Sequence, residues 1–140
     1  MASGPIDANV QKFIEEHVSN LIWGVEQLNI KGELLWLRQL VIEQRMISVH
    51  RRIHTILMGY VLAQEISLEV KEAAINANGI LQLRSEWFTG AFQETDNPVT
   101  VYDEWLETLG EQLTAHSAVL GFPLVHESDR LPHPPESVEE

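Results

Sequence analysis

The stretch that decides the fold is IEQRMISVHRRIHTILMGY, residues 42–60. Apolar side chains recur in it at alternating four- and three-residue steps: Ile42, Met46, Val49, Ile53, Ile56 and Tyr60. This heptad-like spacing places them on one side of an α-helix and suits packing along another helix. We therefore predict a helix over about residues 33–63, in which Gly59 is a point of bending or early termination.

Three further segments have the periodicity of amphipathic helices, in which apolar residues return to one face every three or four positions. They cover about residues 5–28, 67–91 and 100–120. Short turn-like stretches separate the four segments, and none shows the alternating pattern of a strand. The sequence therefore predicts an all-α protein, a small helical bundle of four to five helices.

The ends of these helices have recognisable signals. Ser67 and Thr100 are the expected N-caps of the third and fourth helices, because a short side-chain oxygen accepts a hydrogen bond from the first turn. Gly121 is expected to end the last helix. The stretch NANG, residues 76–79, would either end the third helix early or lie within it, and the sequence leaves both open.

The last part of the chain differs in composition. Residues 126–140 hold three prolines and five acidic residues against one arginine, with few apolar side chains. Such a segment buries too little apolar surface to offset the entropy lost on ordering. We predict a single helical domain over residues 1–124 and a disordered, acidic, proline-containing tail over residues 125–140.

Composition excludes several classes of protein. A net charge of −12 repels a nucleic-acid backbone, so we expect no nucleic-acid partner. The chain contains no cysteine, which excludes disulfides and thiolate metal ligands. No uncharged run approaches the ~20 residues of a membrane span, and the N-terminus lacks the pattern of a secretory signal. We expect a cytoplasmic protein without a membrane partner.

The one basic region lies inside the opening stretch. Residues 38–54 contain four arginines and a single glutamate. His50 and His54 have the four-residue spacing that zinc sites use on a helix, and Glu43 shares their side. A metal needs further ligands from another helix, so we expect no metal and no cofactor. A metal-binding helical protein that uses Glu43, His50 and His54 remains an alternative.

Motifs for catalysis and for reading DNA are missing or weak. The sequence has no Gly-x-Ser-x-Gly elbow, no phosphate-binding glycine loop and no His-Glu-x-x-His, so we expect no enzyme and no catalytic residues. Residues 62–79 loosely resemble a helix-turn-helix. The recognition helix of such a motif would carry two acidic residues, Glu69 and Glu72, and one basic residue, Lys71. This charge is unsuited to the phosphate-lined groove of DNA.

The tryptophans lie where one small bundle does not need them. Trp23 projects opposite the apolar face of its predicted helix, and Trp36 belongs to a segment that is apolar on nearly every side. Trp105 flanks the apolar face of the last predicted helix. Tryptophan and arginine are enriched at binding hot spots. The predicted interface comprises Trp23, Trp36, Leu37, Leu40, His50, Arg51, Arg52, His54 and Trp105.

These features lead to a functional hypothesis. We expect a homodimer that binds another protein, whose identity the sequence does not give. It would be a regulator or antagonist, of the anti-activator, immunity or adaptor type, that occludes a partner's surface with its apolar faces. As an alternative, its small size, low pI and expected dimerisation are similar to those of bacterial type III secretion chaperones, which implies an α/β fold with strands.

Overall fold

The computed structural model describes the backbone of residues 33–131 and the side chains of residues 38–131. This part of the chain consists of α2 (Glu33–Leu62), α3 (Leu68–Glu94), α4 (Pro98–Leu120) and a short 3-10 helix, η1 (Glu127–Asp129). Residues 33–131 contain no strand, so the all-α prediction is confirmed for the described part. The helix predicted over residues 5–28 lies outside it, and the total of four to five helices stays a prediction.

The chain divides into two units between Gln44 and Arg45. The first unit holds the beginning of α2, where the side chain of Ile42 is fully buried. The second unit, Arg45–Leu131, holds the rest of α2 together with α3, α4 and η1.

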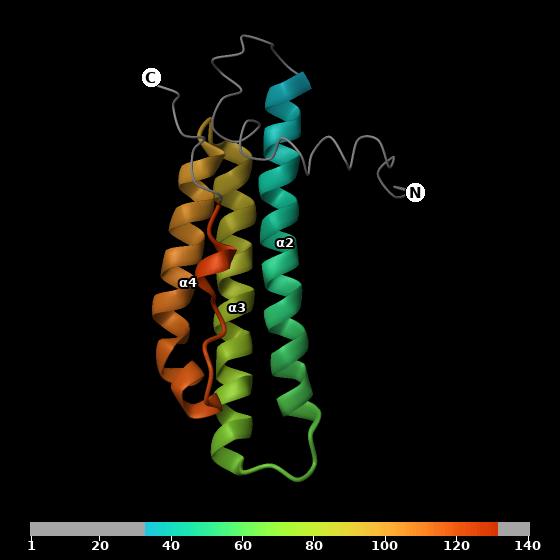
Figure 1. The fold of residues 1–140 in the computed structure, drawn as a ribbon, viewed down its shortest axis with the longest axis vertical. Coiled ribbons are helices and arrows are strands. Elements are labelled where there is room, and N and C mark those ends of the chain that lie inside the picture. The colour runs from blue at the N-terminus through green and yellow to red at the C-terminus, as the bar shows by residue number, and fades with distance from the viewer. Residues whose placement is uncertain (1–32, 132–140) are drawn as a thin grey trace, which may run out of the picture. The chain divides into compact units, whose positions relative to one another are not determined.

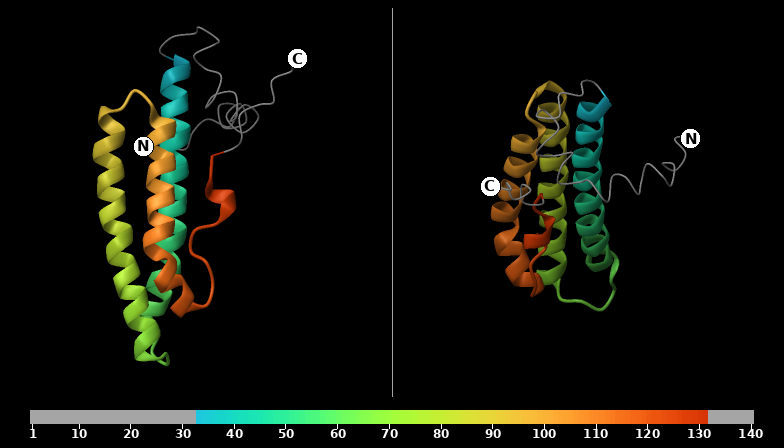
Figure 2. Two further views of the ribbon diagram at one scale, coloured as in Figure 1. Left: turned by 90° about the vertical axis from the view of Figure 1, so that its left-hand side faces the viewer. Right: turned by 45° about the horizontal axis from the view of Figure 1, so that its top comes forward.

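Within the second unit the three helices lie side by side, and consecutive helices run in opposite directions (Figures 1 and 2). Residues 63–67 connect α2 to α3, and residues 95–97 connect α3 to α4. Connections this short make consecutive helices antiparallel neighbours. After α4 the chain turns back. Residues 122–131, which we call the C-terminal strap, lie on the side of α2 and α4 that faces away from α3 (Figure 2).

The predicted seam of residues 42–60 is buried over most of its length. The buried side chains of its second-unit part are Met46, Val49, Ile53 and Leu57, whereas Ile56 and Tyr60 are half-buried. An α-helix with 3.6 residues per turn drifts away from a strict 3.5-residue repeat, which moves the buried position from 56 to 57. The helix passes through Gly59 without interruption and ends at Leu62, one residue before the predicted end.

The third predicted helix begins where expected. The Val70 N–H donates a hydrogen bond to the Ser67 hydroxyl over 3.2 Å, so Ser67 is the N-cap of α3. The helix continues through Gly79 to Glu94, so the NANG stretch does not end it. The buried face of α3 consists of Ala73, Ala74, Ala77, Leu81 and Phe88.

The predicted N-cap of the last helix is wrong. α4 begins at Pro98, and Asn97 caps it by accepting a hydrogen bond from the Thr100 N–H over 3.4 Å. Proline is favourable at the first helical position because the N–H of that residue has no partner within a helix. The predicted end is confirmed. Gly121 has a φ of 98°, which glycine adopts without strain, and its N–H donates to the Ser117 carbonyl.

Aromatic side chains join α3 to α4. The rings of Phe88 and Trp105 meet edge to face with their centroids 5.8 Å apart. Tyr102, one turn before Trp105, has its ring centroid 5.5 Å from the indole. All three side chains are at most 1% exposed. Large rings bury more apolar area than any other side chain, so this group is central to the core.

Replacing Asn97 by alanine removes the cap of α4 and should lower the free energy of unfolding by about 1 kcal/mol. Urea unfolding followed by far-ultraviolet circular dichroism measures the effect. Thr100→Ala is the matched control, because the Thr100 side chain is exposed and alanine is the better helix former. A larger loss in Thr100→Ala than in Asn97→Ala would contradict the assignment of Asn97 as the cap.

Candidate functional site

Arg52 of α2 binds the C-terminal strap. Two guanidinium nitrogens of Arg52 lie 2.6 and 2.8 Å from the two carboxylate oxygens of Asp129, in a two-pronged ion pair. The same guanidinium donates a hydrogen bond to the Leu124 carbonyl over 2.8 Å. A planar group with five fixed donors suits this combination of a carboxylate and a carbonyl acceptor. One arginine therefore holds the strap at two points.

Arg45 and Tyr102 hold the same turn of the strap from two helices. Arg45 of α2 donates to the backbone carbonyls of Ser128 and Arg130 over 3.3 and 3.0 Å. Tyr102 of α4 donates its hydroxyl hydrogen to the Asp129 carbonyl over 2.5 Å. The four side chains Arg45, Arg52, Tyr102 and Asp129 are called the anchor cluster from here on. The basic region seen in the sequence thus binds an acidic segment of the same chain.

The anchor cluster corrects the predicted tail. Disorder was predicted from residue 125 onwards, but residues 125–131 include η1 and are held by α2 and α4. Leu124 and Leu131 are buried, with 1% and 8% of each exposed. Composition alone cannot reveal that Asp129 has an arginine partner 77 residues earlier in the chain. Residues 132–140 lie outside the described residues, and their disorder stays a prediction.

Burial and hydrogen bonding act in opposite directions on Asp129. Burial of the carboxylate acts to raise its pKa, but hydrogen bonds from Arg52 and from the His126 N–H outweigh this and lower the pKa below its ordinary value. Burial raises the pKa of Tyr102, so its hydroxyl stays protonated and remains a donor. At neutral pH the cluster therefore joins one anion, Asp129, two cations, Arg45 and Arg52, and one neutral donor, Tyr102.

His50 and His54 flank the buried seam of α2. Their imidazole rings stack, with centroids 6.1 Å apart and planes at 11°. Nδ1 of His54 lies 3.1 Å from the side-chain oxygen of Asn78 in α3. Burial lowers the pKa of His50, and the neighbouring His54 lowers it further, so His50 is neutral at pH 7. The contact with Asn78 gives His54 a place in the helix packing, whereas the buried Nδ1 of His50 has no hydrogen-bond partner among the described residues.

The alternative of a metal site finds no support in the described part of the chain. Between residues 38 and 131 no three histidine, aspartate or glutamate side chains come together as a group that holds a metal ion. Glu43 is an exposed residue of α2, and His54 is oriented toward Asn78. We therefore assign no ligand role to Glu43, His50 or His54.

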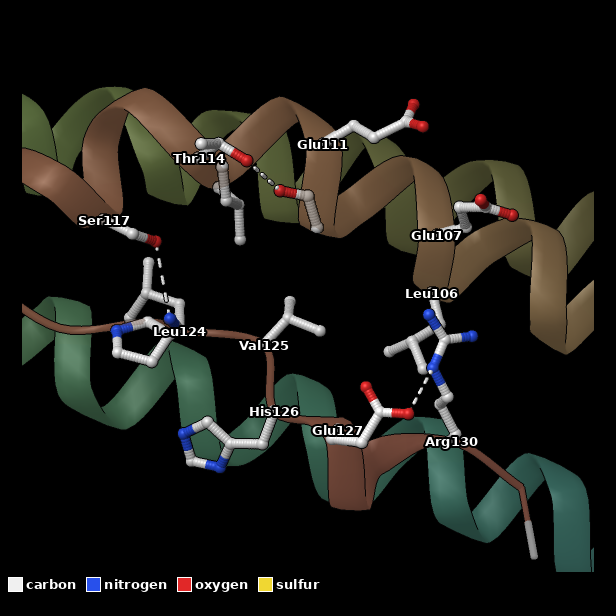
Figure 3. Close-up of a pocket in the computed structure, with 13 residues that line it drawn as sticks. Leu106, Glu107, Glu111, Thr114, Ser117, Leu124, Val125, His126, Glu127 and Arg130 are labelled. Carbon is white, nitrogen blue, oxygen red and sulfur yellow. Dashed lines mark hydrogen bonds and ion pairs between the residues drawn. The ribbon is translucent and has the colours of Figure 1, made fainter. Parts of the chain in front are cut away.

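A cavity of about 430 Å³ lies between α4 and the C-terminal strap (Figure 3). Val125 points into it from the strap (Figure 3). Several polar groups along its walls are already paired within the chain. The Ser117 hydroxyl accepts a hydrogen bond from the Leu124 N–H, and Glu127 pairs with Arg130 at 3.1 Å. These pairs involve part of the polar lining, and the exposed residues Glu107, Glu111 and His126 also line the cavity.

An exposed apolar face of α3 was missed by the sequence reasoning. Leu68, Ile75 and Leu83, which we call the exposed row, are 69%, 50% and 67% exposed. They recur at seven- and eight-residue steps, so they share one side of α3, away from the buried face that includes Leu81. The signal was present in the sequence, because these three residues fall outside the apolar stripe that predicted the helix.

Two predicted interface residues, Trp105 and Arg52, make contacts within the chain. Trp105 is fully buried against Phe88 and Tyr102, so it is not available on a surface of the chain. Its position at the flank of the predicted apolar face suggested partial exposure, but α3 covers that flank. Arg52 forms the ion pair with Asp129 and is 34% exposed, so the structure gives it a contact within the chain, and its contact with a partner stays a prediction.

The other predicted interface residues are divided between described and undescribed parts. Arg51 is exposed on α2, and Leu40 is half-buried. Trp23 lies outside the described residues, as do the side chains of Trp36 and Leu37. Their assignment to an interface stays a prediction.

Asp129→Asn should loosen the strap. The substitution removes the charge that Arg52 pairs with, and we expect a loss of about 2 kcal/mol, a value kept low because Arg52 is 34% exposed. Amide hydrogen exchange of residues 122–131 and urea unfolding measure it. Glu127→Gln is the control, since the Glu127 side chain is 88% exposed. Equal exchange rates in both variants would contradict the anchoring role.

The contribution of Asp129 should depend on pH. Its pKa in the folded chain lies below the ordinary value, so its stabilising effect is present above that ordinary value, about pH 4, and is lost as pH falls through the folded value. The stability difference between the wild type and Asp129→Asn should therefore shrink below about pH 4. Urea unfolding at a series of pH values measures this difference. A difference that stays constant into strong acid would contradict it.

Protein-family models, curated proteins and solved structures gave no match. Among the helices of residues 33–131, none combines the length and apolar character that crossing a membrane requires. The functional argument therefore rests on the described residues and their geometry.

Proposed function

We propose that this protein is a protein-interaction module that acts as a regulator or antagonist by covering a functional surface of a partner. The observation that supports this is the exposed row of α3. Its members are large aliphatic side chains, each at least half exposed, aligned on one side of one helix. Apolar residues scattered singly on a surface are ordinary, whereas an aligned set is typical of an interaction site.

The exposed row is large enough to contribute to binding. Full burial of a leucine or isoleucine side chain contributes about 1.5–3 kcal/mol relative to leaving it exposed. The row extends from residue 68 to residue 83, or about 22 Å along the helix axis. A partner surface of that length corresponds to a helix of about 15 residues or to a groove that accepts α3. Covering such a surface would block whatever else binds there.

The test compares wild type with Ile75→Glu/Leu83→Glu by native mass spectrometry of the chain isolated gently from its own cells. We expect the wild type to retain a second protein and the double variant to lose it, because two charges would have to be buried at the contact. Gln112→Glu/Ala115→Glu is the matched control, since it adds the same charge at exposed positions of α4. Circular dichroism should show unchanged helix content in both variants.

Two outcomes would contradict the proposal. One is a wild-type chain that carries no second protein. The other is a partner that remains bound to Ile75→Glu/Leu83→Glu as tightly as to the α4 control.

A further inference from the structure

We infer that the partner of the exposed row is an α-helix whose apolar face is bordered by lysine or arginine side chains, and that this helix crosses α3 over Gly79. The inference rests on the proposed function and adds the chemistry of the partner. It is supported by an unfilled glycine position, by acidic residues beside the row, and by the charges that a second copy of the chain would bring.

Gly79 lies in the middle of α3, where the described residues give no reason for a glycine. A Cβ atom at this position would meet no atom within 4 Å. Glycine is among the least favourable residues in a helix interior, second only to proline. Gly79 comes four residues after Ile75 and four before Leu83, so it leaves a gap in the exposed row. Such a gap lets the backbone of a second helix approach α3 closely.

Acidic side chains accompany the exposed row. Glu72 lies between Leu68 and Ile75, and Glu86 follows Leu83 by three residues, so both share the side of the row. Both carboxylates are exposed. The basic residues of α3 are both half-buried, and the guanidinium of Arg84 lies over the ring of Trp87, 4.5 Å from its centroid. The face that a partner meets therefore carries three large aliphatic side chains, with one carboxylate between the first two and another beyond the last.

A second copy of the chain is a poor occupant of this face. An antiparallel pair centred on Gly79 would place Ile75 against Leu83 of the other copy. The same arrangement would place Glu72 against Glu86, because these two lie seven residues on either side of Gly79. A parallel pair would oppose each glutamate to itself. Like charges at such contacts are unfavourable, so the geometry favours a basic partner over the predicted homodimer.

The first experiment uses two synthetic helical peptides of 21 residues as probes. Both carry the same leucine face, bordered by lysines in one and by glutamates in the other. Fluorescence anisotropy with the full-length chain should give at least about tenfold tighter binding of the lysine peptide, with an affinity that falls as salt is added. Equal affinities for the two peptides, or tighter binding of the glutamate peptide, would overturn the inference.

The second experiment tests the crossing point with Gly79→Ala. Alanine should raise the melting temperature by roughly 2–6 °C, because it favours the helix and meets nothing inside the chain. It should also weaken binding of the lysine peptide about tenfold, because its methyl group fills the gap. Gly59→Ala is the matched control in α2. A Cβ atom there also meets nothing within 4 Å, so it should raise the melting temperature and leave peptide affinity unchanged.

The outcomes separate this inference from the proposed function. If Gly79→Ala and Gly59→Ala bind the lysine peptide equally, the crossing over Gly79 is wrong. If the native partner is nevertheless lost from Ile75→Glu/Leu83→Glu, the proposed function stands without it. If the native partner binds Ile75→Glu/Leu83→Glu as tightly as the wild type, the proposed function fails, and the inference fails with it.

Discussion

Ile53 of α2, Leu81 of α3 and Trp105 of α4 are all completely excluded from water, and the core to which they belong determines which side of each helix remains outside. A helix turns by about 100° per residue, so a face committed to the core fixes the direction of every other side chain. On α2 the flanks of the buried face carry the histidines and the arginines. On α3 the side away from the core carries the exposed row.

The C-terminal strap illustrates how the core controls polar contacts. Because the strap lies against both α2 and α4, Arg45, Arg52 and Tyr102 reach the same turn of the chain from two helices. A carboxylate as buried as Asp129, which is 5% exposed, would be costly without a cation beside it. The ion pair therefore chiefly fixes where the acidic turn binds along the helices. The burial of apolar surface in the strap comes from Leu124 and Leu131.

The exposed row has the opposite character, because nothing in the described part uses it. Large aliphatic side chains are kept in water, and a glycine that weakens the helix lies among them. Natural sequences agree with their own fold at most positions and depart from it chiefly where function requires it. The anchor cluster has an account within the chain, because its groups bind one another and the strap. The exposed row is the feature for which we propose an external partner.

Within the described residues, the sequence by itself determined the three α-helices, because helical periodicity and end signals are local. The range of α2, the cap at Ser67 and the stop at Gly121 depend on neighbours a few residues away. The predicted N-cap at Thr100 was wrong, because the helix begins earlier, at Pro98. The proline is also a local signal in the sequence.

Only the tertiary structure decided what the flanking residues do. The partner of Arg52 lies 77 residues along the chain, and composition suggested that this partner belonged to a disordered tail. Trp105 lay at the edge of its apolar face, and the sequence does not show that α3 covers that edge. The spacing of the exposed row can be read from the sequence. That these residues are exposed follows only from the buried face of α3, which the structure shows. Periodicity places residues on the side of a helix, whereas only packing determines whether that side meets another helix or water.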